Sequence, residues 1–402
     1  MSDLPFPLSR AADGIGPSAM TSVLKWCTKS DLISFAGGMP DPSLFPIREV
    51  TDAAQTIQKT VGPAALQYLP SAGLPVLREA FRGHLKNRGT VVTEDQIVPV
   101  CGVQQGLSIT CLLLLNQGAE IVVTAPSYFG SLQAFDAWNV KYLSIDLTEQ
   151  GIDLERLEYL FKNHKPRFFY VIPNFQNPSG ITIPDEQRPL IVELCKRYHV
   201  PILEDDVFGD LAYGKQLPTL KSFDDEHVIY LTSVSKTISS GFRVGFVAPP
   251  KALRDKYLRA KELSDVCVNT YTQHIVAELY RNGTFERLLP LLRRTYAQRS
   301  DAIQAALRTY CGDLCSWTRP LGGMFSWLTL HDGTRAEVLL EHASKHGVVF
   351  VPGTAFYPPG KGGEHSLRLS YSNLVPEKLD LGIKLLAESI RNVQRCSPGA
   401  HR

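Results

Sequence analysis

The sequence lacks long hydrophobic runs and a leader-like start, and both absences exclude a class of protein. No apolar run approaches the roughly 18–20 residues that a membrane-spanning helix needs. The longest, around residues 112–115, is followed by Asn116 and Gln117. The opening MSDLPFPLSR has an acidic residue and two prolines where a signal peptide has a basic region and then an apolar one. We therefore expect a cytoplasmic protein.

An excess of charge of either sign is also missing. The 402 residues contain 42 Lys and Arg against 40 Asp and Glu, a net charge of +2, which gives no electrostatic footprint for nucleic acid or for an anionic membrane. Hydrophobic residues (44%) and charged residues (20%) are near the globular average, so disordered, fibrous and coiled-coil chains are excluded. Small molecules are the expected partners.

No metal site is predicted. The eight cysteines are scattered, mostly in apolar stretches, and this pattern is typical of reduced thiols in a core. Only Cys311 and Cys315 are close in sequence, and nothing nearby completes a zinc set. His342 and His346 are one helical turn apart, but two histidines without a third ligand are more often part of a solvated helix face.

Six short apolar runs alternate with helix-length segments from about residue 95 to 250. They are rich in β-branched and aromatic residues and comprise residues 97–100, 120–124, 167–172, 200–203, 228–231 and 244–247. This alternation indicates a mostly parallel sheet built from βα units. Such a sheet binds its ligand at the carboxyl ends of its strands.

The chain divides into three predicted parts. Residues 1–47 are rich in Pro and Gly and are interpreted as an ordered arm rather than a domain. Residues 48–285 form a large domain around the predicted sheet. Residues 286–402 form a smaller α/β domain, with a helix near 335–346 and strand-like runs at 324–328, 348–351 and 367–370.

Polar and aromatic residues stand directly after several of the predicted strands. Gly102–Gly106 follows the first and opens a helical stretch whose free N–H groups could hold a phosphate, although a plain turn explains it as well. Tyr128 follows the second strand and Asn177 the third, each in a loop of ordinary turn formers. The acidic run Glu204–Asp206 follows the fourth, and its burial is costly unless a cation lies nearby.

The most specific pattern follows the fifth strand. Lys236 stands among hydroxyl residues, and Arg243 follows seven residues later. Burial would lower the pKa of the lysine so that its amine can form a Schiff base, while the hydroxyls and Arg243 hold a phosphate. A surface lysine beside a polar loop would explain this segment alone, but not all five strand ends together. A phosphate cradle, an aromatic platform, an amide, a carboxylate and an amine at one sheet edge are what pyridoxal 5′-phosphate requires.

These motifs, in this order and spacing, resemble the fold-type I, class I aminotransferases, in particular the branch that contains α-aminoadipate and kynurenine aminotransferases. The resemblance covers nearly the whole chain, from residues 33–40 and 66–74 to 367–372, and its most specific motifs are Ser-x-Ser-Lys…Gly-Phe-Arg-x-Gly and Asn-Pro-Ser-Gly. It implies the α/β fold of type I pyridoxal-phosphate-dependent transferases, with a mostly parallel sheet in the large domain, a smaller C-terminal α/β domain and an N-terminal arm that contributes to the active site.

The resemblance also implies roles for the matching residues. Lys236 would bind the cofactor covalently and carry the proton between the substrate Cα and the cofactor, while Asp205 would pair with the pyridinium nitrogen. Asn177 would donate to the phenolic oxygen, and Tyr128 would stack on the ring. The phosphate would be bound by the backbone of Val103 and Gln104 and the side chains of Ser233, Ser235 and Arg243.

Two further implied contacts involve distant parts of the chain. Tyr68 would reach the phosphate of the other subunit, which implies a homodimer with shared active sites. Arg368 would bind the substrate α-carboxylate, helped by Asn177 and the backbone at Gly38.

Two residues depart from the family pattern. Phe208 stands three residues after Asp205, where the family usually has Tyr, so one donor to the phenolic oxygen is missing. Thr21 stands where the branch often has an arginine that binds a distal carboxylate. A hydroxyl cannot offset the burial of a carboxylate. We therefore expect an amino donor with an apolar, aromatic or otherwise non-acidic side chain, and a 2-oxo acid such as 2-oxoglutarate as the acceptor.

Two other functions stay open at this point. A pyridoxal-phosphate-dependent lyase or decarboxylase would share the same cofactor motifs, because a fold does not determine the reaction. A ligand sensor would need a DNA-binding module before the sheet domain, where only about 47 residues stand, few of them basic.

Overall fold

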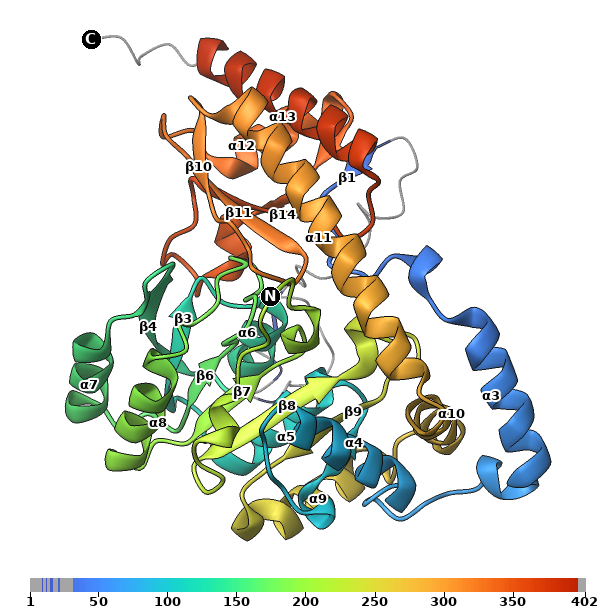
Figure 1. Cartoon of the computed structure of the whole chain (residues 1–402). Helices are drawn as coiled ribbons and strands as arrows, with labels where there is room; N and C mark the ends of the chain where they lie inside the picture. The colour runs from blue at the N-terminus through green and yellow to red at the C-terminus, as the bar shows by residue number, and fades with distance from the viewer. Residues whose placement is uncertain (1–8, 10–11, 13–14, 17–20, 22–31, 397–402) are drawn as a thin grey trace, which may run out of the picture.

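The computed structural model describes residues 9, 12, 15, 16, 21 and 32–396. The largest sheet of this part has eight strands: β2 (Val98–Val100), β3 (Glu120–Ala125), β4 (Lys141–Thr148), β5 (Gly151–Ile152), β6 (Phe169–Val171), β7 (Ile202–Asp205), β8 (Val228–Ser233) and β9 (Gly245–Ala248). Their order in space is β2-β9-β8-β7-β6-β3-β4-β5. Figure 1 shows this sheet in the lower half of the molecule, with helices around it.

The middle of the sheet is parallel, as the alternating pattern predicts. β3 pairs in parallel with β4 and β6, β6 with β7, and β7 with β8, whereas β2, β5 and β9 pair antiparallel. Every residue of β7 and β8 is buried, as is typical of strands covered on both faces. All six predicted strands are present. The pattern does not predict β4, because its sequence KYLSIDLT mixes polar and apolar residues near the sheet edge.

Helices cover both faces of the sheet. Successive residues of a strand point to opposite faces, so neighbouring residues pack against different helices. Val123 belongs to the core that includes α5 (Val103–Leu114) and α9 (Arg254–Asp265), and Val122 to the core that includes α7 (Leu154–Asn163) and α8 (Gln187–Arg197). The other helices around this sheet are α3 (Ile47–Thr60), α4 (Pro75–Asn87), α6 (Phe129–Asp136) and α10 (Thr270–Arg281). No helix in the described part of the chain is long and apolar enough to cross a membrane.

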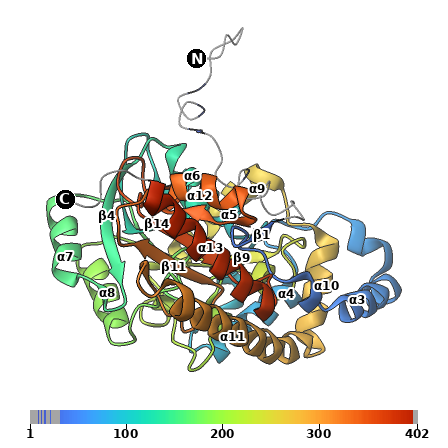
Figure 2. The same ribbon diagram turned by 90° about the horizontal axis from the view of Figure 1, so that it is seen from above.

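A second, smaller sheet is antiparallel and comes from the C-terminal part of the chain. Its strands are β10 (Cys315–Trp317), β11 (Phe325–Leu330), β13 (Val351–Pro352) and β14 (Ser366–Ser370), in the order β10-β11-β14-β13. The predicted helix near 335–346 is α12 (Ala336–Lys345). Two long helices, α11 (Thr284–Cys311) and α13 (Pro376–Cys396), share an apolar core with this sheet and lie side by side (Figure 2).

The helix α11 connects the two parts of the molecule. Its residue Phe285 packs in a core of the large sheet, whereas Leu292 packs in the core of the small one. Figure 1 shows the helix running from the upper part down to α10. The division at residue 285 stays a prediction, and so does the arm boundary at residue 47.

Residues 33–41, which we term the strap, are attached to the small-sheet side. β1 (Ile33–Ser34) pairs in parallel with β12 (Val348–Val349). The carbonyl of Met39 accepts a hydrogen bond from Oγ of Ser372 at 2.6 Å. Asp41 forms an ion pair with Arg299 of α11. These contacts hold the strap against the small sheet while its middle part reaches the edge of the large one.

Candidate active site

A cavity of about 750 Å³ opens at the carboxyl ends of β6, β7 and β8, where the sequence predicts the ligand site. Gly37, Gly38 and Met39 of the strap and Arg368 of β14 also line it. All predicted site residues except Tyr68 line this cavity. They are Gly38, Val103, Gln104, Tyr128, Asn177, Asp205, Phe208, Ser233, Ser235, Lys236, Arg243 and Arg368.

The end of the cavity beside α5 has the features of an anion site. Gly102, with a φ of 72°, precedes Val103, the first residue of α5, and the first N–H groups of a helix have no acceptor within it. A Cβ at Gly102 would lie 2.5 Å from Nη2 of Arg243. The same Nη2 donates to the carbonyl of Cys101 at 3.0 Å. A guanidinium beside free helix N–H groups favours a phosphate.

Two hydroxyls complete this anion site. Ser233 ends β8 and Ser235 lies in the turn that follows, and their Oγ atoms are 2.7 Å apart. Oγ of Ser233 also donates to the carbonyl of Val244 at 3.0 Å. Both side chains are buried, so this strand end and the start of α5 present hydroxyl and amide groups to one end of the cavity.

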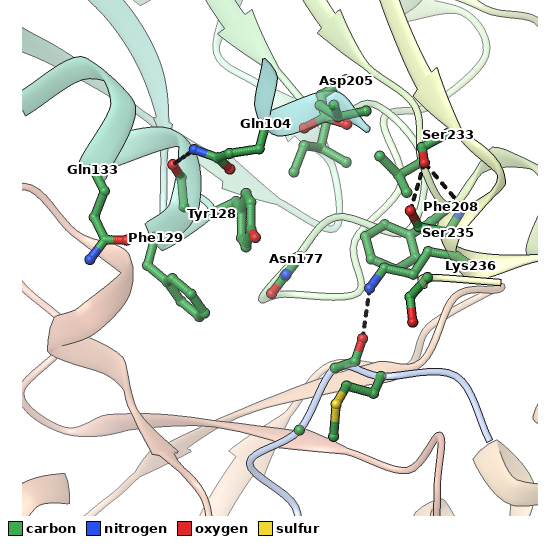
Figure 3. Close-up of a pocket in the computed structure, with 18 of the residues that line it drawn as sticks. Gln104, Tyr128, Phe129, Gln133, Asn177, Asp205, Phe208, Ser233, Ser235 and Lys236 are labelled. Carbon is green, nitrogen blue, oxygen red and sulfur yellow. Dashed lines mark hydrogen bonds between the residues drawn. The ribbon is translucent and has the colours of Figure 1, made fainter. Parts of the chain in front are cut away.

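Lys236 follows in the same turn, and its Nζ donates a hydrogen bond to the carbonyl of Gly38 in the strap at 2.8 Å (Figure 3). Burial, together with the positive charges of Arg368 and Arg243, lowers the pKa of Lys236 to about 8, against the opposing effect of Asp205. An amine with this pKa is partly neutral near physiological pH, which a nucleophile or a proton acceptor requires.

Asp205 is the last residue of β7 and is almost completely buried. Its Oδ2 accepts a hydrogen bond from the hydroxyl of Tyr170 at 2.9 Å. Its Oδ1 is buried and has no hydrogen-bond partner among the described residues. Burial raises the pKa of Asp205 to about 7, and the charge of Asp206 adds to this rise, while the hydrogen bond from Tyr170 opposes it.

Asp206 belongs to a different environment. Its carboxylate contacts Arg88 and accepts hydrogen bonds from Nδ2 of Asn174 at 2.7 Å and from the hydroxyl of Tyr230 at 3.0 Å. Asp206 is buried and does not line the cavity. Of the acidic run Glu204–Asp206, only Asp205 therefore faces the cavity.

Arg368 of β14 lies on the opposite side of the cavity. Its Nη1 donates to Oδ1 of Asn177 at 2.9 Å, and its Nη2 donates to the carbonyl of Ala36 in the strap. The guanidinium carbon lies 4.6 Å from the ring centroid of Phe325 and 5.0 Å from that of Phe356. Stacking and hydrogen bonds hold the planar fork in one orientation, which suits a carboxylate.

Tyr128 and Phe208 bring aromatic rings to the cavity. Tyr128 directly precedes α6, and burial together with the charge of Asp205 raises the pKa of its hydroxyl to about 12. A Cβ at Gly130 would lie 2.6 Å from this ring, so a larger residue at this position would displace the ring. Phe208 packs edge-on against Phe325, with ring centroids 5.5 Å apart, and has no side-chain hydrogen-bond donor.

Sequence reasoning misses eight lining residues: Gly37, Met39, Phe129, Gly130, Gln133, Ile172, Val207 and Ser240. Phe129, Gly130 and Gln133 lie on α6, which begins directly after Tyr128, so they follow the same strand end. Met39 and Val207 are apolar, and nothing in their sequence pattern separates them from core residues. Tyr170 does not line the cavity but donates a hydrogen bond to Asp205. Sequence reasoning misses it as well, because it lies within a strand rather than after one.

Neither the predicted site residue Tyr68 nor Thr21, the position at which the branch often has an arginine, lines the cavity. Tyr68 has 78% of its surface exposed and does not line the cavity of its own chain. Its predicted contact involves a second subunit and stays a prediction. Thr21 is exposed, and the neighbouring residues 17–20 and 22–31 lie outside the described part of the chain.

The residues present fit pyridoxal phosphate at three points. The buried Oδ1 of Asp205 can accept a hydrogen bond from a ring nitrogen. The start of α5, with Gly102 and Arg243, offers donors to a phosphate and has no room for a Cβ. The amine of Lys236 lies in the same cavity with a lowered pKa, as a carbonyl-binding lysine requires.

Comparison with known proteins agrees with this fit. The family described as aminotransferase class I and II matches residues 31–386. The 2-aminoadipate transaminase of Thermus thermophilus is 37% identical over 390 residues, which cover 96% of each chain.

Two solved structures have the same fold and a similar length. The α-aminoadipate aminotransferase of Thermus thermophilus, complexed with N-(5′-phosphopyridoxyl)-L-leucine, has a TM-score of 0.90 and 35% identity, and the match covers 97% of this chain and 98% of that one. The kynurenine aminotransferase of Pyrococcus horikoshii has a TM-score of 0.91 and 35% identity, with 96% and 97% of the two chains covered.

The fold and the cavity together define a pyridoxal-phosphate-dependent enzyme of fold type I. More particularly, the chain belongs to the aminotransferase class I and II family and is a transaminase of the branch that contains the aminoadipate and kynurenine aminotransferases. The predictions of the fold class, the cofactor and the type of reaction are confirmed.

Proposed function

We propose that the enzyme transfers the amino group of an L-amino acid with a non-acidic side chain to a 2-oxo acid such as 2-oxoglutarate. The observation that carries this proposal is the set of cationic side chains around the cavity. In the described part of the chain, these are Lys236, Arg243 and Arg368. Cofactor attachment, the phosphate and the α-carboxylate use all three, so none is left for a distal carboxylate.

The rest of the lining supports the same preference. Met39, Phe129, Ile172, Val207 and Phe208 are apolar and line the cavity. A carboxylate among such groups loses its hydration without gaining a cationic partner, whereas an apolar or aromatic side chain has no such cost. An acidic acceptor such as 2-oxoglutarate requires a further cation that enters the cavity when the acceptor binds.

In this proposal the sheet edge binds the cofactor. Lys236 is the point of attachment, Asp205 pairs with the ring nitrogen, Asn177 donates to the phenolic oxygen, and Tyr128 lies against the ring. The phosphate accepts hydrogen bonds from the backbone of Val103 and Gln104 and from the side chains of Ser233, Ser235 and Arg243. The convergence of these residues on one cavity supports the assignment.

The reaction then depends on the charges of two residues. When bound, the cofactor supplies an electron sink for the pair that the substrate Cα keeps after losing its proton. Asp205 keeps the ring nitrogen protonated, because a carboxylate favours the charged form of its partner. Nζ of Lys236, with its lowered pKa, would take the proton from the substrate Cα and deliver it to the cofactor, so that the nitrogen stays there and a 2-oxo acid can leave.

Arg368 orients the substrate at the other side of the cavity. Its guanidinium binds the α-carboxylate through two parallel hydrogen bonds, and the backbone N–H of Gly38 assists. The contacts of Arg368 with Asn177 and with the strap carbonyl of Ala36 support this role, because they fix the direction of the fork. The Cα–H bond of the substrate is thereby directed toward Lys236.

The assembly and the location are part of the same proposal. The enzyme is a cytoplasmic homodimer in which Tyr68 of the partner subunit donates to the phosphate. The exposed position of Tyr68, outside the cavity of its own chain, supports this arrangement. Light scattering during turnover checks it: a fully active species of monomeric mass would exclude shared active sites.

A screen of amino donors tests the proposed substrate class. Single amino acids are mixed with the loaded enzyme, and the rate of conversion of the cofactor absorbance is measured together with release of the 2-oxo acid. Leucine, methionine and phenylalanine should react faster than 2-aminoadipate. A preference of tenfold or more for 2-aminoadipate would overturn the proposal. Release of ammonia or carbon dioxide would instead identify a lyase or a decarboxylase.

The variant Thr21→Arg tests where the side chain of the amino donor binds. Thr21→Arg should raise the half-reaction rate with acidic donors and leave the rate with leucine nearly unchanged, because it adds the missing cation. An equal change for acidic and apolar donors would place the side-chain pocket elsewhere.

A further inference from the structure

Asp205 and Asp206 are adjacent, but two different tyrosines bind them. Tyr170 of β6 donates to Oδ2 of Asp205 at 2.9 Å, and Tyr230 of β8 donates to Oδ2 of Asp206 at 3.0 Å. Both tyrosines are fully buried. The two hydroxyls therefore make equivalent hydrogen bonds to successive carboxylates, of which only that of Asp205 faces the cavity.

We propose that Tyr170 is a positioning residue, whose hydroxyl holds one oxygen of Asp205 so that the other is presented to the ring nitrogen of the cofactor. This inference rests on the proposed pairing of Asp205 with that nitrogen. Tyr170 itself does not line the cavity, so it acts only through Asp205.

The geometry around Asp205 leaves one oxygen for the cofactor. Oδ2 is occupied by Tyr170, whereas Oδ1 is buried without a partner among the described residues. The backbone N–H of Val207 also acts on this carboxylate, but loss of the tyrosine hydroxyl would give the group more freedom to rotate about its Cβ–Cγ bond. The hydroxyl removes this freedom before the cofactor binds, and preorganisation of this kind lowers the cost of binding.

The surroundings of Tyr170 keep its hydroxyl in the donating form and its ring in one orientation. Burial and the charge of Asp205 hold the pKa of Tyr170 well above its usual value, so the hydroxyl stays protonated. The ring packs edge-on against Phe135 of α6, with centroids 5.3 Å apart. The helix α6 begins directly after Tyr128, so it also supports the ring predicted to stack on the cofactor.

The hydrogen bond also affects the charge of Asp205. Burial raises the pKa of this carboxyl group to about 7, and the bond from Tyr170 opposes the rise. Loss of the hydroxyl therefore raises the pKa further, and a larger fraction of the cofactor-free chain then has a neutral Asp205 near pH 7. A neutral carboxyl group is a weaker partner for a protonated ring nitrogen.

The experiment measures cofactor binding rather than turnover. Cofactor-free enzyme is titrated with pyridoxal phosphate and with its 1-deaza analogue, in which carbon replaces the ring nitrogen. The ratio of the two dissociation constants reports the contact with that nitrogen. Tyr170→Phe should reduce the preference of wild type for the natural cofactor by about tenfold, the size expected for one hydrogen bond to a charged group.

Tyr230→Phe is the matched control. It removes an equally buried hydroxyl from the neighbouring aspartate, outside the cavity. The preference should stay within about twofold of wild type, because Asp206 keeps its contacts with Arg88 and Asn174. An unchanged preference in Tyr170→Phe, or an equal loss in both variants, would overturn the inference.

A double variant separates this inference from the proposed function. In the background Asp205→Asn, Tyr170→Phe should have no further effect on the preference, because its only route to the cofactor is removed. If Asp205→Asn itself leaves the preference unchanged, the assigned partner of the ring nitrogen is wrong. If Tyr170→Phe does not fold, Tyr170→Met lacks the hydroxyl and adapts its shape to the core, and it gives the same test.

Discussion

The two ends of the cavity are built in different ways. At the sheet end, Asp205, Ser233 and Lys236 directly follow or end neighbouring strands of one sheet. At the strap end, Arg368 comes from the small sheet and is oriented by Asn177 and by the carbonyl of Ala36. One end is thus positioned by a single hydrogen-bonded framework, and the other by segments that meet only in the complete fold.

This difference separates two kinds of effect. The sheet end holds an acid and a base whose pKa values are shifted toward each other. The pKa of Asp205 is raised to about 7 and that of Lys236 is lowered to about 8. The strap end holds one guanidinium between aromatic rings. Changes at the sheet end should therefore alter the chemistry and the retention of the cofactor, while changes at the strap end should alter substrate binding.

The largest effect is expected at Lys236. Lys236→Ala should still bind the cofactor, without a covalent bond, but turnover should fall by about 10⁴-fold or more, because the attachment and the proton carrier are lost together. Steady-state turnover and absorbance spectra measure both. In the wild type, borohydride reduction should attach the cofactor to a peptide that contains Lys236; a labelled peptide without this residue would refute the assignment.

A smaller but still large effect is expected at Asp205. Asp205→Asn should leave the fold intact but reduce turnover by about 10²-fold or more, because a neutral amide does not keep the ring nitrogen of the cofactor protonated. Asp206→Asn is the neighbouring control, and it should mainly lower the melting temperature, because Asp206 contacts Arg88, Asn174 and Tyr230. The opposite result would show that the sheet end is assigned one residue out of register.

Arg368→Lys tests the strap end. The variant keeps the charge but loses the planar fork and its stacking on Phe325, so KM for amino donors should rise by about tenfold or more. The dissociation constant of the cofactor should change little. A parallel loss of cofactor affinity would break the distinction between the two ends.

The smallest effect is expected at Phe208, which lies 5.9 Å from Nζ of Lys236, measured to the ring centroid. Phe208→Tyr adds a donor to the phenolic oxygen of the bound cofactor. Stabilising that anion favours the deprotonated form of the lysine-bound cofactor, so its spectroscopic pKa should fall by about one unit. An absorbance titration that shows no shift, or an upward shift, would contradict this position of Phe208.

The same two ends differ in how far they can be predicted from sequence. Strand ends are visible as apolar runs, so the acidic run Glu204–Asp206 and Lys236 can be located and grouped from the sequence alone, while the family resemblance is needed to single out Asp205 within the run. Arg368 lies within a predicted strand, and only the family resemblance assigns it to the site. The lining residues Met39 and Val207 have no chemical signal of their own. The role of Tyr170 cannot be predicted from sequence either. Its hydroxyl meets Asp205 only because of the register of β6 against β7.

The pairing of β1 with β12 has a consequence for how the protein is made. Ile33 pairs with Val348, so β1 is synthesised more than 300 residues before its partner. The strands that carry the sheet end, residues 98–248, leave the ribosome much earlier than β12 and can pair with one another first. The carbonyls of Ala36 and Gly38 reach their final positions only when nearly the whole chain has emerged. The chain can therefore bind an amino acid at Arg368 and the strap only after nearly all of it has been synthesised.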